Sequence, residues 1–162
     1  MGEGPVLIGF DGTPASEHAI RESATLLRGR DALVVVVWRR DAGLEGVQVP
    51  VGPVGLEPPV LDVSKLVELD EVLWEHAQRM AQWGAQVAEA AGFKAKSLTA
   101  ADEYEVSIAQ TLIRLARKHD SPAIVVGAHA QGRLSNLLLG STSHDVVRHA
   151  DRPVVVVREQ SS

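Results

Sequence analysis

The 162-residue chain contains no cysteine, so it has no disulfide, no thiolate metal ligand and no cysteine nucleophile. Aromatic residues are scarce, at 4%, and acidic residues outnumber basic ones, which gives a formal net charge of −5. A nucleic-acid partner requires a basic surface, and a single strand also requires aromatic side chains for stacking, so neither is expected. With 45% hydrophobic and 23% charged residues, the composition is that of a globular chain that buries one substantial core.

Long apolar stretches are also lacking. The longest uninterrupted one, residues 32–38, is far too short to span a bilayer. Residues 1–5 have no basic segment that leads into an apolar core, so no signal peptide is predicted. Among the six histidines, His144 and His149 are five residues apart and do not share a helical face. We therefore expect one cytoplasmic domain over residues 1–162, without a membrane segment and without a metal-ligand set of its own.

Short β-branched segments alternate with helical ones, which is the pattern of an α/β fold with a parallel sheet. Five strands are expected, at residues 5–10, 33–38, 93–99, 123–126 and 153–157, and four helices, at 14–29, 64–91, 105–119 and 142–150. Thr13 is expected to cap the first helix, with Pro14 in its first turn, and Thr142 and Asp145 form a possible capping box on the last. The apolar stripe of the second helix is interpreted as a core face.

Residues 41–62 differ from the rest in composition, because they contain four glycines and four prolines. Such a sequence predicts an irregular insertion. A loop of this length is usually functional or disordered, and it follows a central strand, so it is expected at the carboxyl edge of the sheet. A lid and a tolerated insertion are equally open interpretations.

A candidate anion site lies near the end of the chain. The apolar run 123–126 stops at Gly127, and Gly140 precedes Ser141, Thr142 and Ser143 at the start of the last predicted helix. The first turn of a helix offers amides without intrahelical acceptors and the positive end of the helix dipole, both of which favour an anion. The sequence therefore predicts a phosphate ligand here.

The spacing of Gly127, nine residues from 131 to 139, and Gly140-Ser141 resembles the Gly-x2-Gly-x9-Gly-Ser/Thr motif of the universal stress protein family. The resemblance runs from the first predicted strand to the last. It implies a Rossmann-like five-stranded parallel sheet of order 3-2-1-4-5 with helices on both faces. One position departs from the motif, because Ala130 stands where the family has its second glycine, and Gly132 follows two residues later. If the backbone requires a positive φ there, alanine costs about 1 kcal/mol or more.

The resemblance also implies an adenine nucleotide, ATP or AMP, with Mg²⁺. Asp11 would contact the ribose or the cation; its alternative role is to shape the Asp11-Gly12 turn and cap the next helix. Trp38 ends the second strand, where relatives hold the base, and either lines the base pocket or covers the edge of the core. The expected binding residues are Asp11, Gly12, Trp38, Gly127, His129, Ala130, Gly132, Arg133, Gly140, Ser141 and Thr142.

The leading functional hypothesis is a stress-response regulatory protein that binds this nucleotide and acts through conformation or partners. No catalytic residue is assigned, because the chain has no Gly-x4-Gly-Lys-Ser/Thr loop and no lysine in the phosphate loop, so the activity is at most that of a slow ATPase. The alternative is a nucleotide-free interaction module of the same fold, with its site impaired by Ala130. A receiver domain fails because Asp11 stands alone after the first strand, and a flavin-binding variant fails because no hydroxyl-rich phosphate loop follows that strand.

The final predicted strand covers residues 153–157, in which Pro153 is followed by four valines. At the edge of a sheet, such a strand is an exposed pairing surface unless something covers it. The resemblance implies a homodimer that pairs residues 153–157 with their symmetry mate. A helix or the C-terminal tail could cover this edge instead.

Overall fold

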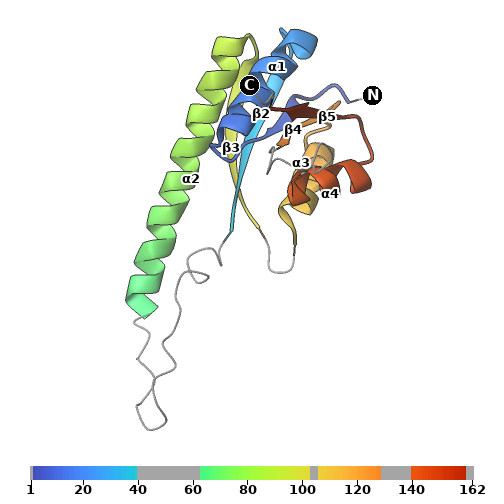
Figure 1. Cartoon of the computed structure of the whole chain (residues 1–162). Coiled ribbons are helices and arrows are strands. Elements are labelled where there is room, and N and C mark those ends of the chain that lie inside the picture. Colours follow the sequence, from blue (N-terminus) through green and yellow to red (C-terminus); the bar gives the residue numbers. More distant parts are fainter. Residues whose placement is uncertain (1, 40–62, 103–105, 129–139, 160–162) are drawn as a thin grey trace.

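The computed structural model describes residues 2–39, 63–102, 106–128 and 140–159, and the 41–62 insertion lies outside them. Strands and helices alternate along these residues (Figure 1). In chain order they are β1 (Val6–Gly9), α1 (Pro14–Leu27), β2 (Asp31–Trp38), α2 (Val63–Ala91), β3 (Lys94–Ala101), α3 (Ile108–Lys118), β4 (Ile124–Ala128), α4 (Ser141–His149) and β5 (Val154–Arg158).

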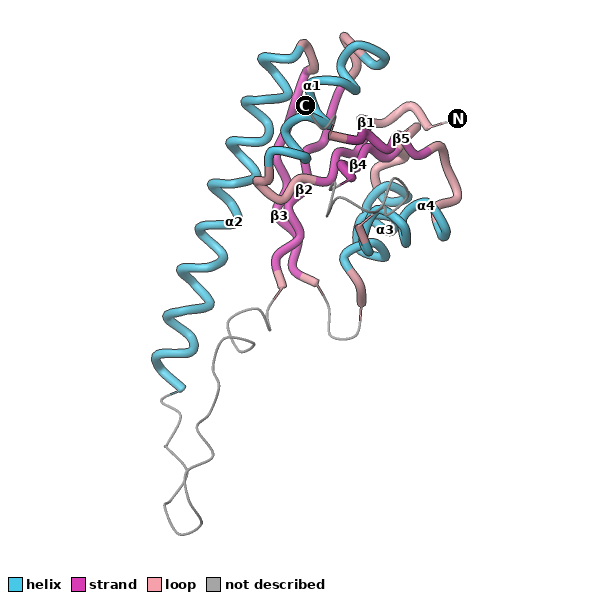
Figure 2. Tube along the Cα trace, viewed as in Figure 1, coloured by secondary structure: helices cyan, strands magenta, loops and turns pink. Residues whose placement is uncertain are grey.

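The strands form one parallel sheet of order β3-β2-β1-β4-β5, which confirms the predicted topology. Alternate residues of the buried strands point to opposite faces. On one face, Val34 and Val36 of β2 pack with apolar residues of α1 and α2; on the other, Leu33 and Val35 pack with α3 and with Val146 of α4. The helices therefore form one layer on each side of the sheet (Figure 2).

The start of α1 follows the prediction. Thr13 is the N-cap, its hydroxyl accepts a hydrogen bond from the Ser16 amide (3.2 Å), and Pro14 occupies the first turn. The predicted capping box of α4 is wrong, because the helix begins one residue earlier, at Ser141, and its N-cap, Gly140, has no side chain to accept a bond. Thr142 therefore lies inside the first turn of α4.

The third helix, α3, begins with a capping box that was not predicted. Ser107 accepts from the Gln110 amide, and the Gln110 side chain accepts from the Ser107 amide. This reciprocal pair sets the helix start at Ile108, three residues later than the predicted start at residue 105.

The second helix is buried over only part of its length. Its buried positions, from Ala77 onward, are all small: Ala77, Ala81, Gly84, Ala85 and Ala88. Gly84 permits the closest approach, because a Cβ there would lie 2.7 Å from Cδ1 of Phe10 and 2.8 Å from Cγ1 of Val34. The interpretation of the whole apolar stripe as core is wrong for the first half of α2, where Leu69 is 40% exposed.

A cluster of charged side chains ties the end of α3 to the turn before β5. Arg152 donates through Nη1 to the carbonyls of Ala116 and Ser121 (2.8 Å each) and through Nε to Asp151 (2.9 Å). Arg117 donates to the other oxygen of Asp151 (2.9 Å). Hydrogen bonds from the two guanidinium groups hold the pKa of Asp151 well below its usual range. The carbonyl of Ala116, in the last turn of α3, and that of Ser121, just after the helix, thus share a charged donor from a distant part of the chain.

Candidate functional site

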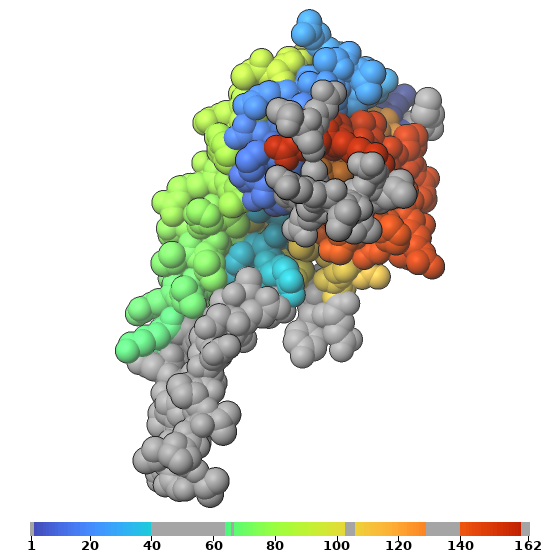
Figure 3. Space-filling view, in the orientation of Figure 1, coloured from blue at the N-terminus to red at the C-terminus, as the bar shows by residue number. Residues whose placement is uncertain are grey.

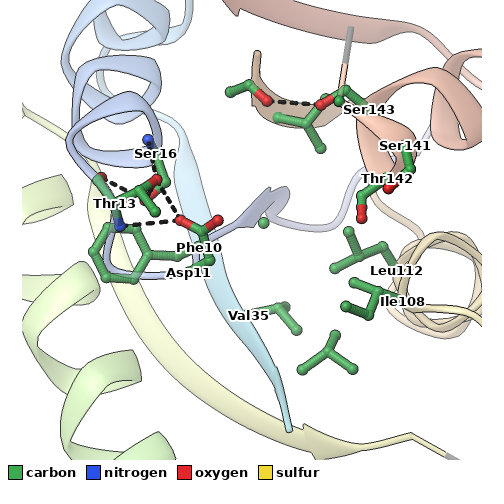
Figure 4. Close-up of a pocket in the computed structure, with 15 residues that line it drawn as sticks. Phe10, Asp11, Thr13, Ser16, Val35, Ile108, Leu112, Ser141, Thr142 and Ser143 are labelled. Carbon is green, nitrogen blue, oxygen red and sulfur yellow. Dashed lines mark hydrogen bonds between the residues drawn. The ribbon is translucent and has the colours of Figure 1, made fainter. Parts of the chain in front are cut away.

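A cavity of about 450 Å³ opens at the carboxyl ends of the central strands β1 and β4 (Figure 4). Its volume lies within the range of small-molecule pockets. Ligands of open parallel sheets bind at this edge, where the chain order reverses between neighbouring strands. The lining residues are Gly9, Phe10, Asp11, Thr13, Ser16, Val35, Val37, Ile108, Leu112, Val126, Gly127, Gly140, Ser141, Thr142 and Ser143.

One part of the cavity wall is apolar. Val35 and Val37 of β2 and Ile108 and Leu112 of α3 line it, and in Figure 4 the labelled side chains of Val35, Ile108 and Leu112 lie near one another. None of these four residues was expected at the site. Their signal was present in the sequence: on a strand buried on both faces, the odd-numbered valines must face opposite the even-numbered Val34 and Val36.

The same alternation determines on which face of the sheet the Trp38 side chain lies. Its side chain lies on the α2 face of the sheet, where its ring contacts Trp74 edge-on at a centroid distance of 5.6 Å, and it does not line the cavity. Trp38 thus covers the edge of the core, and its expected place beside the base stays a prediction.

The backbone carbonyls at the end of β2 also alternate in direction, some toward β3 and some toward β1. The Trp38 carbonyl accepts from the Asp102 amide (2.9 Å), toward β3, while the Val35 carbonyl accepts from the Phe10 amide (2.9 Å), toward β1. Because bonding directions alternate along a parallel strand, the Val37 carbonyl faces the same side as that of Val35, which is the side of the cavity.

The turn between β1 and α1 supplies one polar wall. Asp11 accepts hydrogen bonds through Oδ1 from the amide (3.0 Å) and the hydroxyl (2.5 Å) of Thr13, and Gly12 adopts a φ of 77°. Asp11 thus shapes the turn, as its alternative reading expected, and also lines the cavity. Asp11 is the single charged side chain among the described lining residues.

The first turn of α4 supplies the second polar wall. Ser141 and Thr142 line the cavity, and Figure 4 shows their hydroxyls on the side of Leu112 and Ile108. The buried Ser143 donates through Oγ to the Gly127 carbonyl (2.7 Å) and thereby fixes the helix start against the end of β4.

Gly127 has a packing role at this junction. A Cβ on Gly127 would lie 2.8 Å from the Ala15 carbonyl oxygen and 3.0 Å from its carbon, so only glycine lets β4 approach the first turn of α1 this closely. The N-termini of α1 and α4 therefore both border the cavity, on either side of Gly127.

The structure brings five of the expected residues to the cavity: Asp11, Gly127, Gly140, Ser141 and Thr142. The four expected residues of the intervening loop, His129, Ala130, Gly132 and Arg133, lie outside the described residues. Within the described part of the chain, no three histidine or acidic side chains are grouped so as to hold a metal. A helix long and apolar enough to cross a membrane is likewise absent from the residues that the structure describes.

Comparisons with known proteins identify a family for this chain. The model of the universal stress protein family matches residues 4–158. A universal stress protein of Mycolicibacterium smegmatis is 31% identical over 159 residues, covering 95% of this chain and 45% of the relative, so the chain spans about half the length of the curated relatives it matches.

Solved structures share the fold at lower identity. The universal stress protein from Archaeoglobus fulgidus in complex with dAMP has a TM-score of 0.57 at 19% identity and covers 97% of this chain and 99% of its own. A universal stress protein in complex with cAMP has a TM-score of 0.61 at 17% identity and covers 95% and 96%.

Proposed function

The chain belongs to the universal stress protein family, and from this premise we propose that it is a regulatory protein that binds an adenine nucleotide, ATP or AMP, in the cavity described above. The observation that carries the proposal is the composition of that cavity, in which an apolar wall meets two helix N-termini. The dAMP and cAMP held by proteins of similar fold support an adenine nucleotide over other anions.

The base fits the apolar wall. Val35, Val37, Ile108 and Leu112 offer aliphatic surface to a planar ring, and the Val37 carbonyl offers an acceptor for an exocyclic amine. A backbone group that contacts the base in this way requires no particular side chain, so the residue type at position 37 carries no signal for it.

The phosphates fit the first turn of α4. Amides of Ser141 to Ser143 have no acceptor within the helix, and the hydroxyls of Ser141 and Thr142 add donors beside them. Across the cavity, Asp11 would accept from a ribose hydroxyl or share a Mg²⁺ ion with the phosphates. Mg²⁺ commonly binds through one or two carboxylates, phosphate oxygens and water, so a single acidic residue in the described wall is sufficient.

The proposed activity is binding, with slow ATP hydrolysis as its upper limit. Asp11, the one charged group in the described wall, already accepts two hydrogen bonds from Thr13, so its carboxylate is used to shape the turn and is not assigned as a general base. A cytoplasmic location accords with this regulatory role.

The nucleotide-free interaction module is the second candidate. It is favoured by Gly127, because contact with the backbone of Ala15 explains this glycine without any ligand. The motif glycine thus supports the fold independently of nucleotide binding.

We also propose that the protein forms a homodimer through β5. This strand is at the edge of the sheet, paired on one side with β4, and Val154 to Val157 retain partial exposure. A second copy of β5 would pair the open side and bury these valines.

The test is to denature the purified protein, identify the released small molecules by ion-exchange chromatography with mass detection, and titrate the nucleotide-free protein with MgATP and with AMP by calorimetry. Ile108→Trp, which fills the apolar wall, should weaken binding at least about tenfold, equivalent to about 1.4 kcal/mol. Leu26→Ala, on an exposed face of α1, is the control and should bind as the unaltered protein does. A blank extract together with no binding of either nucleotide would refute the proposal in favour of the nucleotide-free module.

A further inference from the structure

The first half of α2 extends past the core, and we call its residues 64–75 the overhang. Every described side chain of the overhang is exposed or half-buried, whereas small residues are buried at intervals of three and four from Ala77 onward. In Figure 1 this end of α2 runs beyond the layer of helices α3 and α4, and in Figure 3 it projects from the body of the molecule.

The overhang nevertheless has the composition of a contact surface. Val67, Leu69 and Val72 are 54%, 40% and 58% exposed, and they account for half of the six exposed large hydrophobic residues among those described. A helix that is apolar on part of its surface ordinarily buries that part, and a segment of this length gains little helical stability from propensity alone.

Acidic residues accompany these apolar side chains. Glu68, Glu71 and Glu75 recur at steps of three and four and therefore form one row along the helix, and all three are exposed. On the helical surface this row has Val67 on one side and Val72 on the other. The overhang contains four acidic residues and one lysine, so it combines apolar surface with a local excess of negative charge.

The negative charge of the overhang limits which molecules could bind to it. A second copy would bring a second acidic row against the first, and like charges in contact oppose association. The connecting residues 40–62 hold four acidic residues and one arginine, so this segment of the chain offers no charge complementarity either. An anionic membrane or a nucleic acid is disfavoured for the same reason. The complementary occupant is therefore a protein surface of opposite charge, which neither a second copy nor residues 40–62 provide.

We propose that the overhang is a docking surface for a basic amphipathic helix of a partner protein. Lysine or arginine side chains of the partner pair with the row Glu68, Glu71 and Glu75, and its apolar residues cover Val67 and Val72. This interaction is separate from the cavity, because no residue of the overhang lines it.

The test uses a synthetic helical peptide that repeats Leu-Lys-Lys-Leu-Leu-Lys-Leu, titrated into the full chain by calorimetry. The double variant Glu68→Lys/Val72→Ser alters an acidic and an apolar residue one helical turn apart in the overhang. The matched control, Glu22→Lys/Leu26→Ser, makes the same change of charge and polarity at the same spacing on the exposed face of α1. Circular dichroism and thermal denaturation verify that both variants are folded.

We expect the overhang variant to weaken peptide binding at least about tenfold, or about 1.4 kcal/mol, while the control variant binds as the unaltered protein does. Binding should also weaken as salt is added, because exposed charges are screened. A peptide with glutamate in place of lysine should not bind. Equal losses in the two variants, binding of the glutamate peptide, or self-association that the overhang variant abolishes would each overturn the proposal.

Discussion

Replacing Gly127 by alanine tests the close approach of β4 to α1. The new Cβ would meet backbone atoms, the Ala15 carbonyl oxygen at 2.8 Å and carbon at 3.0 Å, which cannot rotate away as a side chain can. Steric overpacking of this kind costs about 1–3 kcal/mol. For a chain of this size, each kcal/mol lowers Tm by about 2–4 °C, so Tm should fall by roughly 2–12 °C.

Gly9→Ala is the matched control, since Gly9 is also a strand residue at the cavity. Its Cβ would meet the flexible end of a side chain, Cδ1 of Leu112 at 3.2 Å, with Cγ1 of Val126 next at 3.6 Å. An unobstructed glycine-to-alanine change stabilises by about 0.4–1 kcal/mol through the unfolded chain, which offsets this milder contact. Urea and thermal denaturation should therefore rank Gly127→Ala well below Gly9→Ala. If Gly127→Ala matched the unaltered protein in stability, the packing account of this glycine would be refuted.

Three further changes test other contacts. Arg152→Met removes the charged donor from the carbonyls of Ala116, in α3, and Ser121, just after it, and should lower the free energy of unfolding by about 1–3 kcal/mol in urea. Arg21→Met, at an exposed i,i+4 pair, should change it by less than about 0.5 kcal/mol. Because the folded pKa of Asp151 is depressed, its contribution to stability is present above the unfolded pKa, near 3.8, and is lost as pH falls toward the folded pKa. Asp151→Asn should therefore be less stable than the unaltered protein at pH 7, and in acid-denaturation curves the difference should begin to shrink below about pH 4 and continue to shrink as the pH falls further. Ser143→Ala removes the buried hydrogen bond to the Gly127 carbonyl and should lower the free energy of unfolding by about 1 kcal/mol, as measured by thermal denaturation. The same change should weaken nucleotide binding. Unchanged affinity would mean that this bond does not position the phosphate site.

The sequence alone was sufficient to predict the end of a helix where a capping residue could occupy only one position. Thr13 and Pro14 fixed the start of α1, because a hydroxyl cap and a residue without an amide proton have few other places in a helix. The same reasoning failed at Thr142, because Gly140, which has no side chain to donate or accept, occupies the cap position of α4. The strand order came from the family resemblance and is confirmed by the pairing of the strands.

The candidate site was predicted in part. Polar residues after strands, such as Asp11 and Ser141, could be assigned to the carboxyl edge from chain position alone. The apolar wall could not be assigned in this way, because Ile108 and Leu112 come from a helix whose rotation about its axis is set by packing against β1 and β2. The exposed first half of α2 was missed for a related reason: periodicity identifies an apolar face, and only the length of the neighbouring strands decides how much of that face meets a core.

The contact between Trp38 and Trp74 has a spectroscopic consequence. The chain has three tryptophans, and the third, Trp83, also belongs to α2, where its ring meets Phe10 edge-on at 5.3 Å. All three indoles thus lie on the α2 side of the sheet, so intrinsic tryptophan emission during unfolding follows that half of the molecule, while far-ultraviolet dichroism also follows α3 and α4. Superimposable curves from the two signals would mean that the layers on the two faces of the sheet separate from it in a single cooperative step.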